Sequence, residues 1–433
     1  MILKSRRVVT PGGVHAASIH IRGEKIERLG GYDEESDIDY RDLVIMPGLV
    51  DSHVHVNEPG RTEWEGFESA TRAAAAGGVT TIVDMPLNSI PPTISVEALM
   101  TKAEAMKGKC WVDVGLWGGA VPGNASELRE MVREGALGFK CFLVDSGVPE
   151  FRHLDADGLA DALDALRDTN APLLVHAELP EFISDANGSS YRAYLQSRPR
   201  AAEDAAIDLV FDKAKRGGTR AHIVHLSSAG GLDRLRRARD ARVSLTAETT
   251  PHYLHFESEK IPDGAPEFKC APPIREHANR EELWRGVKEG LLPAIVSDHS
   301  PCTPELKRLH DGNVERAWGG IASLQFGLPI IWSEQRLDLE TIANLMCAGP
   351  ATIAGIEGRK GKIAAGYDAD LVVWSPEERF RITPEMIHHR HKVTPYEGEE
   401  LSGVVKSTYV RGRKVWEDGR AIGKPSGLWI SKN

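Results

Sequence analysis

Four histidines and one aspartate in this sequence have the side-chain chemistry needed to bind divalent metal ions. His53 and His55 are two residues apart, so on a strand both side chains point to the same side. His176, His225 and Asp298 each lie at the end of another short apolar run. Neutral imidazole and carboxylate are common ligands of zinc and related metals. An H-x-H pair alone is weak evidence, but with the other three residues it predicts a metal centre.

Lys140 is a sixth candidate, within the apolar segment GFKCFL. An unpaired ammonium group is costly to bury, so this lysine either extends to solvent, pairs with an acid or has a special role. Because an ammonium group cannot bind a cation, Lys140 would have to lose its proton or be chemically modified to join a metal centre.

A further histidine, His222, lies three residues before His225. On a regular strand their side chains point to opposite faces, so only one can join the metal centre. We expect His225 to do so because it is nearer the end of the strand. His222 is then expected to be a hydrogen-bonded structural residue between the strand and a helix.

Eight short apolar runs alternate with helical patterns through the middle of the chain, which predicts a (β/α)8 barrel. A doubly wound open sheet is the alternative fold, but no G-x-G-x-x-G follows the first strand and there is no P-loop. The carboxyl ends of barrel strands meet at one rim, where all six candidates would converge. The expected strands are 43–55, 79–86, 111–118, 136–143, 172–178, 220–227, 242–248 and 293–300, and the expected helices are 68–78, 96–108, 126–135, 157–169, 205–218, 229–240 and 280–290.

Both ends of the chain show a different pattern, with apolar and polar residues alternating between glycine-containing turns. We therefore expect residues 1–47 and 360–433 to form one small β-sandwich domain beside a barrel of residues 48–359. The fold class is α/β.

Composition excludes several classes of protein. The 433 residues are 41% hydrophobic, so the chain is not disordered, and a net charge of −10 disfavours a general nucleic-acid binder. The first residues, MILKSRRVVTPGG, lack the apolar h-region of a signal peptide, so we expect none, and no run of roughly 18–20 apolar residues could span a bilayer. Five cysteines without a C-x-x-C pair indicate a reducing, cytoplasmic setting.

Several motifs together resemble the cyclic amidohydrolases of the amidohydrolase superfamily, and the resemblance covers almost the whole chain. They are PGLVDSHVHVNEPGRTEWEGFESATRAAAAGGVTTIVDMPLNSIPPT, GFKCFL, VHAE, HIVHLSSAGG, ETTPHYLHF, FKCAPPIR, VSDHSPCTPELK, AWGGIASLQFGLP and GKIAAGYDADLVVW.

The resemblance implies a binuclear centre that activates a bridging hydroxide to open a cyclic amide. It implies that His53 and His55 bind one metal ion, that His176 and His225 bind the other, that a CO2-derived carbamate on Lys140 bridges them, and that Asp298 completes the first site and acts as general base. Zn²⁺ is the expected ion, although the ligand types also accept Co²⁺, Mn²⁺ or Fe²⁺. The resemblance also implies a homotetramer.

Three positions indicate a branch of this family. Dihydroorotases usually carry an arginine two residues after the second histidine, where this chain has Asn57. They also tend to have MPNT where this chain has MPLN, and hydantoinases and dihydropyrimidinases usually have a tyrosine shortly after the bridging lysine, where this chain has FLVDSG. The pattern favours a branch that opens the hydantoin ring of a small, neutral ureide. A hydantoinase or dihydropyrimidinase is the alternative enzyme, and a non-catalytic scaffold is the alternative from another class.

Candidate substrate contacts are Asn88, Ser146, Cys270, Trp318 and Gly319. Each also has an ordinary structural interpretation, as a turn residue for Ser146 and as packing for Cys270 and Trp318. Lys269 and Arg275 either steer a polar substrate or lie at the surface. The run HHRH at 388–391 is interpreted as solvated surface.

Overall fold

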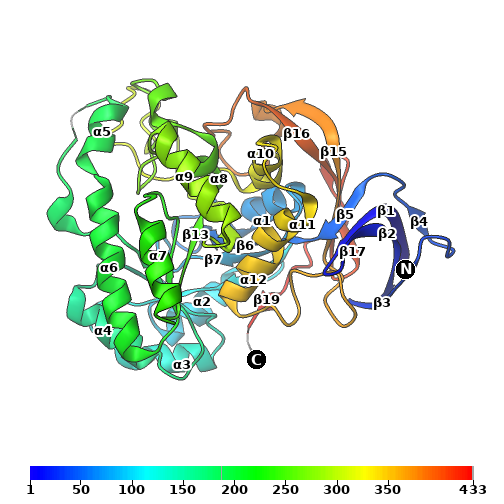
Figure 1. Ribbon diagram of the computed structural model, residues 1–433, viewed down its shortest axis with the longest axis horizontal. Coiled ribbons are helices and arrows are strands. Elements are labelled where there is room, and N and C mark those ends of the chain that lie inside the picture. Colours follow the sequence, from blue (N-terminus) through cyan, green and yellow to red (C-terminus); the bar gives the residue numbers. More distant parts are fainter. Residues whose placement is uncertain (187, 432–433) are drawn as a thin grey trace.

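The computed structural model describes residues 1–186 and 188–431, which form a barrel and a β-rich region built from both chain ends (Figure 1). Among these residues, none of the helices combines the length and the apolar composition that crossing a bilayer requires.

All eight predicted barrel strands are present and parallel, so the predicted barrel is confirmed. They pair in two sheets, and a parallel bridge between Val54 and His299 joins the first strand to the segment after the last. The short strand β9 (Gly118–Gly119) continues β8 and pairs with β10. The barrel strands are β6 (Leu49–Val54), β7 (Val79–Asp84), β8 (Asp113–Leu116), β10 (Phe139–Phe142), β11 (Leu173–His176), β12 (Ala221–Ile223), β13 (Leu245–Thr249) and β14 (Ala294–Ile295).

The predicted helices lie on the outside of the barrel, as Figure 1 shows for α4, α6 and α7. Two of them start at a side-chain cap: Ser95 and Asp155 accept hydrogen bonds from the first turns of α2 and α4. The helices are α1 (Phe67–Ala76), α2 (Val96–Ala105), α3 (Leu128–Arg133), α4 (Ala156–Ala165), α6 (Arg200–Gly217), α7 (Gly231–Asp240) and α9 (His277–Lys288). The sequence patterns did not predict the shorter helices α5 (Tyr191–Ser197), α8 (Pro251–His255), α10 (Gly327–Ser333), α11 (Leu339–Ala343) and α12 (Gly349–Ala354).

The two chain ends form one nine-stranded sheet, which confirms the small β domain. Its two halves meet where β5 pairs antiparallel with β15, with Val373 opposite Ile45. Strand β19 (Trp429–Ile430) leaves this sheet and pairs with β8 of the barrel. We propose the domain boundaries 1–47, 48–359 and 360–433, with β19 as an exception. The strands of the sheet are β1 (Ile2–Thr10), β2 (Gly13–Arg22), β3 (Lys25–Gly31), β4 (Ile38–Asp39), β5 (Val44–Pro47), β15 (Leu371–Arg381), β16 (Glu400–Val410), β17 (Arg413–Glu417) and β18 (Arg420–Ala421).

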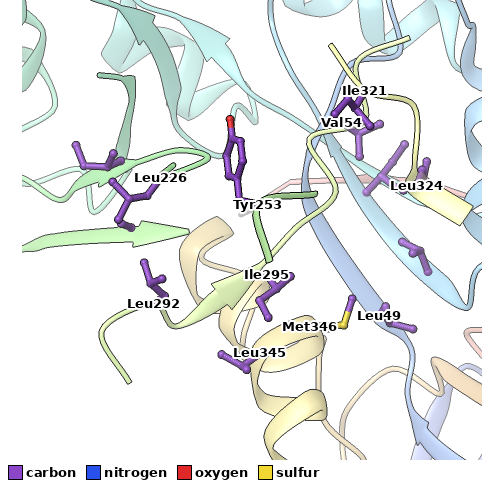
Figure 2. Packing of buried hydrophobic residues seen from close by; sticks show 14 of the residues in the cluster. Leu49, Val54, Leu226, Tyr253, Leu292, Ile295, Ile321, Leu324, Leu345 and Met346 are labelled. Carbon is purple, nitrogen blue, oxygen red and sulfur yellow. The ribbon is translucent and has the colours of Figure 1, made fainter. Parts of the chain in front are cut away.

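A large apolar core fixes the barrel strands that carry the candidate residues. Leu49 of β6 and Ile295 of β14 pack in the same cluster as Leu345 and Met346 (Figure 2). All four side chains are nearly fully buried. This packing holds the strands that lead to His53 and to Asp298.

A buried ionic cluster joins the barrel to the β domain. The ammonium group of Lys360 lies 2.7 Å from Asp113 Oδ2, 2.9 Å from Asp368 Oδ2 and 2.6 Å from Asp370 Oδ2. Arg411 also pairs with Asp113. The three carboxylates are close enough together to hold a metal ion, but Lys360 already supplies the positive charge between them.

Candidate metal centre

The six predicted residues converge at one end of the barrel, and all line the same cavity. Three of them, His53, His55 and Asp298, form a first group. His53 Nε2 lies 3.1 Å and His55 Nε2 3.7 Å from Asp298 Oδ1. The ligand atoms of these three buried residues all lie within 4.8 Å of one another, which is close enough to hold one ion.

The other two histidines form a second group beside the first. His176 Nδ1 lies 3.1 Å from His225 Nε2. The ring centroids of His53 and His225 are 5.3 Å apart, so the two groups adjoin. The geometry therefore suits two ions held side by side.

The donor atoms fit divalent metal ions. His53 Nε2 and Lys140 Nζ are buried and have no hydrogen-bond partner among the described residues. A buried polar atom without a partner is costly unless something else binds it. Four imidazoles, a carboxylate and an amine form a donor set typical of transition-metal sites.

Burial shifts the pKa values of the site in the direction that metal binding needs. It lowers the pKa of His53 to about 4 and holds the pKa values of His55 and His225 well below their usual range. These histidines are therefore neutral, which is the form that binds metal. Burial also lowers the pKa of Lys140 to about 8, although Asp298 acts in the opposite direction.

Irregular strand ends aim the ligands. His225 and Asp298 have positive φ angles of 40° and 46°, which non-glycine residues rarely adopt. Such backbone strain concentrates at functional sites, where the surrounding structure enforces it.

His53 is oriented by a carboxylate that the sequence analysis missed. Its Nδ1 lies 2.6 Å from Glu248 Oε1, and the other oxygen of Glu248 lies 3.1 Å from His222 Nε2. The contact leaves His53 Nε2 to face the metal site. Burial would raise the pKa of Glu248, but His222 and His53 outweigh it and lower the pKa to about 2.

The placement of His222 corrects one expectation. It is hydrogen bonded, as predicted, but to Thr246 and Glu248 on the neighbouring strand rather than between strand and helix. It does not line the cavity, whereas His225 does. The positive φ of His225 breaks the two-residue alternation on which the expectation rested.

His176 has a carboxylate partner of its own. Its Nε2 lies 2.7 Å from Glu178 Oε2, which also accepts a 2.6 Å hydrogen bond from Arg198. Burial would raise the pKa of Glu178, but Arg198 and His176 lower it to about 2. The spacing of Glu178, two residues after His176, is the one local signal that could have revealed this pair.

The cavity above the centre has a volume of about 510 Å³. Asn88, Ser146, Trp318 and Gly319 line it, but Cys270 does not: it is buried between Lys269 and Ala271, which do. Ser146 Oγ also donates a hydrogen bond to Phe151 O at 2.5 Å, as expected of a turn residue.

The surface interpretation is wrong for Lys269, Arg275 and His389, although Arg390 of the HHRH run is exposed. Lys269 is buried and donates to the carbonyls of Glu315 and Ala317, and Arg275 is buried against Glu203. In the HHRH run, His389 is only 1% exposed and its ring packs edge-on against His299. These contacts join segments far apart in the sequence, so composition could not reveal them.

Comparisons with known proteins agree with this geometry. Residues 44–415 match the model of the amidohydrolase family. The chain is 46% identical to an allantoinase of Streptomyces avermitilis, covering 100% of this chain and 98% of that protein. It is 44% identical to an allantoinase of Arabidopsis thaliana, covering 96% and 88%. An L-hydantoinase (dihydropyrimidinase) from Arthrobacter aurescens superimposes with a TM-score of 0.93 at 29% identity, covering 100% and 99% of the two chains.

Proposed function

Because the chain belongs to the amidohydrolase family, we propose that it is a metal-dependent hydrolase of cyclic amides that opens the hydantoin ring of allantoin to give allantoate. One observation carries the proposal: four histidines, Lys140 and Asp298 all line a single cavity. The near full-length similarity to allantoinases selects this ring among other cyclic amides.

His53, His55 and Asp298 would hold one divalent ion and His176 and His225 the other. Lys140, as a carbamate formed with CO2, would join both sites. A carbamate is anionic, so it would remove the cost of burying an unpaired ammonium group there. Such ions, with Zn²⁺ expected and Co²⁺, Mn²⁺ or Fe²⁺ compatible, polarise a carbonyl and lower the pKa of water.

We propose that Asp298 moves the proton of the reaction. Hydrolysis forms a C–O bond from water to the ring amide carbon and breaks the C–N bond. The proton lost by the attacking water must reach the departing nitrogen. The buried carboxylate of Asp298 would accept that proton and then deliver it, acting first as base and then as acid.

The chain lacks one ionic partner that a carboxylate-bearing ring would use. The position where dihydroorotases carry an arginine is Asn57, whose amide oxygen accepts a 3.1 Å hydrogen bond from Asn88. Asn88, Ser146, Trp318 and Gly319 are the proposed substrate contacts. Cys270 is no longer among them, because it lies behind the wall.

A substrate panel with metal analysis on the same sample tests the proposal. Purified protein is assayed with allantoin, hydantoin, dihydrouracil and dihydroorotate, and its metal content is measured. We expect the highest kcat/KM with allantoin and about two metal ions per chain. A preference for dihydrouracil would support the second candidate, a dihydropyrimidinase, which the similarity to the Arthrobacter enzyme favours. Less than about one ion per chain would instead indicate a non-catalytic scaffold.

We also propose that the enzyme is a cytoplasmic homotetramer. The five cysteines are free and buried, in keeping with a reducing compartment. Light scattering coupled to size-exclusion chromatography would measure the assembly, and a mass near 190 kDa, about four times the 47.4 kDa chain, is expected.

A further inference from the structure

Four charged residues support the second pair of histidines, and we call them the α6 network because they surround the start of helix α6. They are Glu178, Arg198, Glu203 and Arg275. Three of them are buried, and Arg198 is half-buried and also lines the cavity. Glu178 and Glu203 are 0% and 2% exposed, and Arg275 is 4% exposed. Two carboxylates and two guanidinium groups make the α6 network electrically neutral.

One half of the network contacts His176. Glu178 accepts a hydrogen bond from His176 Nε2 at 2.7 Å. It also accepts two hydrogen bonds from Arg198, at 2.6 and 3.0 Å. A histidine that donates one ring hydrogen to a carboxylate presents its other nitrogen to a metal. Glu178 and Arg198 therefore direct His176 Nδ1 toward His225.

The other half holds the backbone just after His225. Glu203 Oε2 accepts hydrogen bonds of 3.0 Å from the amides of both Ser227 and Ser228. Arg275 binds the other oxygen of Glu203 at 2.6 Å. This anchor fixes the loop that follows the strained φ of His225.

The two halves are joined. Arg275 Nη1 donates to the backbone carbonyl of Arg198 at 3.3 Å. One histidine of the first metal group, His53, uses a separate carboxylate, Glu248. Each group of histidines thus has its own set of supporting charges.

Stability alone is a weak reason for such a network. The free energy lost when charged groups leave water is about as large as the free energy gained from their attraction, so buried ion pairs add little net stability. Their contacts with His176 and with the backbone just after His225 point to a role in positioning ligands.

We propose that the α6 network is a positioning device for one metal ion, the ion held by His176 and His225, and that it acts independently of the other ion. The inference rests on the proposed binuclear centre. It predicts that the two metal affinities can be changed separately.

Calorimetric titration of the metal-free protein with Zn²⁺, in bicarbonate buffer, tests this. We expect Glu178→Gln and Glu203→Gln each to weaken one of two binding events about 10–100-fold. The double variant of these two should keep one tight ion, because both act on the same site. Combining Glu178→Gln with Glu248→Gln should leave no tight ion, because those residues support different sites.

Zn²⁺ binding by the wild type and by the variants distinguishes failure of this inference from failure of the proposed function. A wild-type protein that binds no Zn²⁺ would refute both. A wild-type protein that binds two ions, with unchanged affinities in folded Glu178→Gln and Glu203→Gln, would refute the inference alone. So would loss of both tight ions in the Glu178→Gln/Glu203→Gln protein. If circular dichroism shows that either variant does not fold, Arg198→Lys and Arg275→Lys are titrated instead. Lysine keeps the positive charge but cannot donate two hydrogen bonds to one carboxylate as arginine does.

Discussion

Replacing Lys360 by methionine should strongly destabilise the protein without touching the metal centre. The Lys360 ammonium group lies within 2.9 Å of three buried carboxylates, those of Asp113, Asp368 and Asp370. Methionine keeps most of the side-chain volume but leaves these negative charges facing one another. Removing one partner of a buried ion pair costs about 3–5 kcal/mol, so we expect a loss in that range in the free energy of unfolding.

The chain provides a matched control in Lys25. Its ammonium group lies 2.6 Å from the other oxygen of Asp368, but its side chain is 50% exposed. Solvent screens such a pair, so Lys25→Met should cost less than about 1 kcal/mol. Equilibrium urea unfolding, followed by tryptophan fluorescence at equal metal content, compares the two variants.

The pH dependence of the loss supplies a second criterion. Burial would raise the pKa of Asp368, but Lys360 and its other cationic partners lower it from 3.8 to about 2. A carboxylate with a lowered pKa stabilises the fold above its unfolded pKa and loses that contribution as the pH falls through the folded value. The deficit of Lys360→Met should therefore be full at neutral pH, shrink as the pH falls and be smallest near pH 2, where Asp368 of the wild type becomes protonated. A deficit no larger than that of Lys25→Met, or one that stays constant down to pH 3, would refute the electrostatic explanation.

Three further predictions concern the metal centre. Asp298→Asn should retain metal but lose about 10²- to 10⁴-fold in kcat, because the amide cannot carry the proton; near-normal turnover would remove Asp298 from the reaction. Lys140→Met should abolish the rise in melting temperature that Zn²⁺ gives the wild type. The metal-free variant should melt no lower than the metal-free wild type, because it buries no unpaired ammonium group. Treatment with a chelator should abolish allantoin hydrolysis, and Zn²⁺ with bicarbonate should restore more activity than Zn²⁺ in CO2-free buffer; equal recovery would argue against the carbamate.

The sequence was sufficient to predict the barrel and the residues at its rim. The alternation of apolar runs with amphipathic helices is a local signal, and each of the eight strands forms where that signal lies. Parallel barrel strands place all their carboxyl ends at one rim, so residues such as His176 and Asp298 converge without knowledge of any particular contact.

The supporting contacts were not predictable in the same way. The partnership of His53 with Glu248 depends on which side chains meet across the barrel, 195 residues apart in sequence. His222 was misplaced because one positive φ, at His225, shifts the direction of the strand end. His389 was misread because its polar neighbours in sequence hide a packing contact with His299.

The residue types at the strand ends were therefore determined by the sequence alone, since they follow from short-range periodicity and fold symmetry. Only the tertiary structure decided how those residues are oriented, which charges support them and which candidate contacts reach the cavity. Side-chain direction at irregular strand ends and the pairing of buried charges depend on distant segments, and a local pattern contains no information about either.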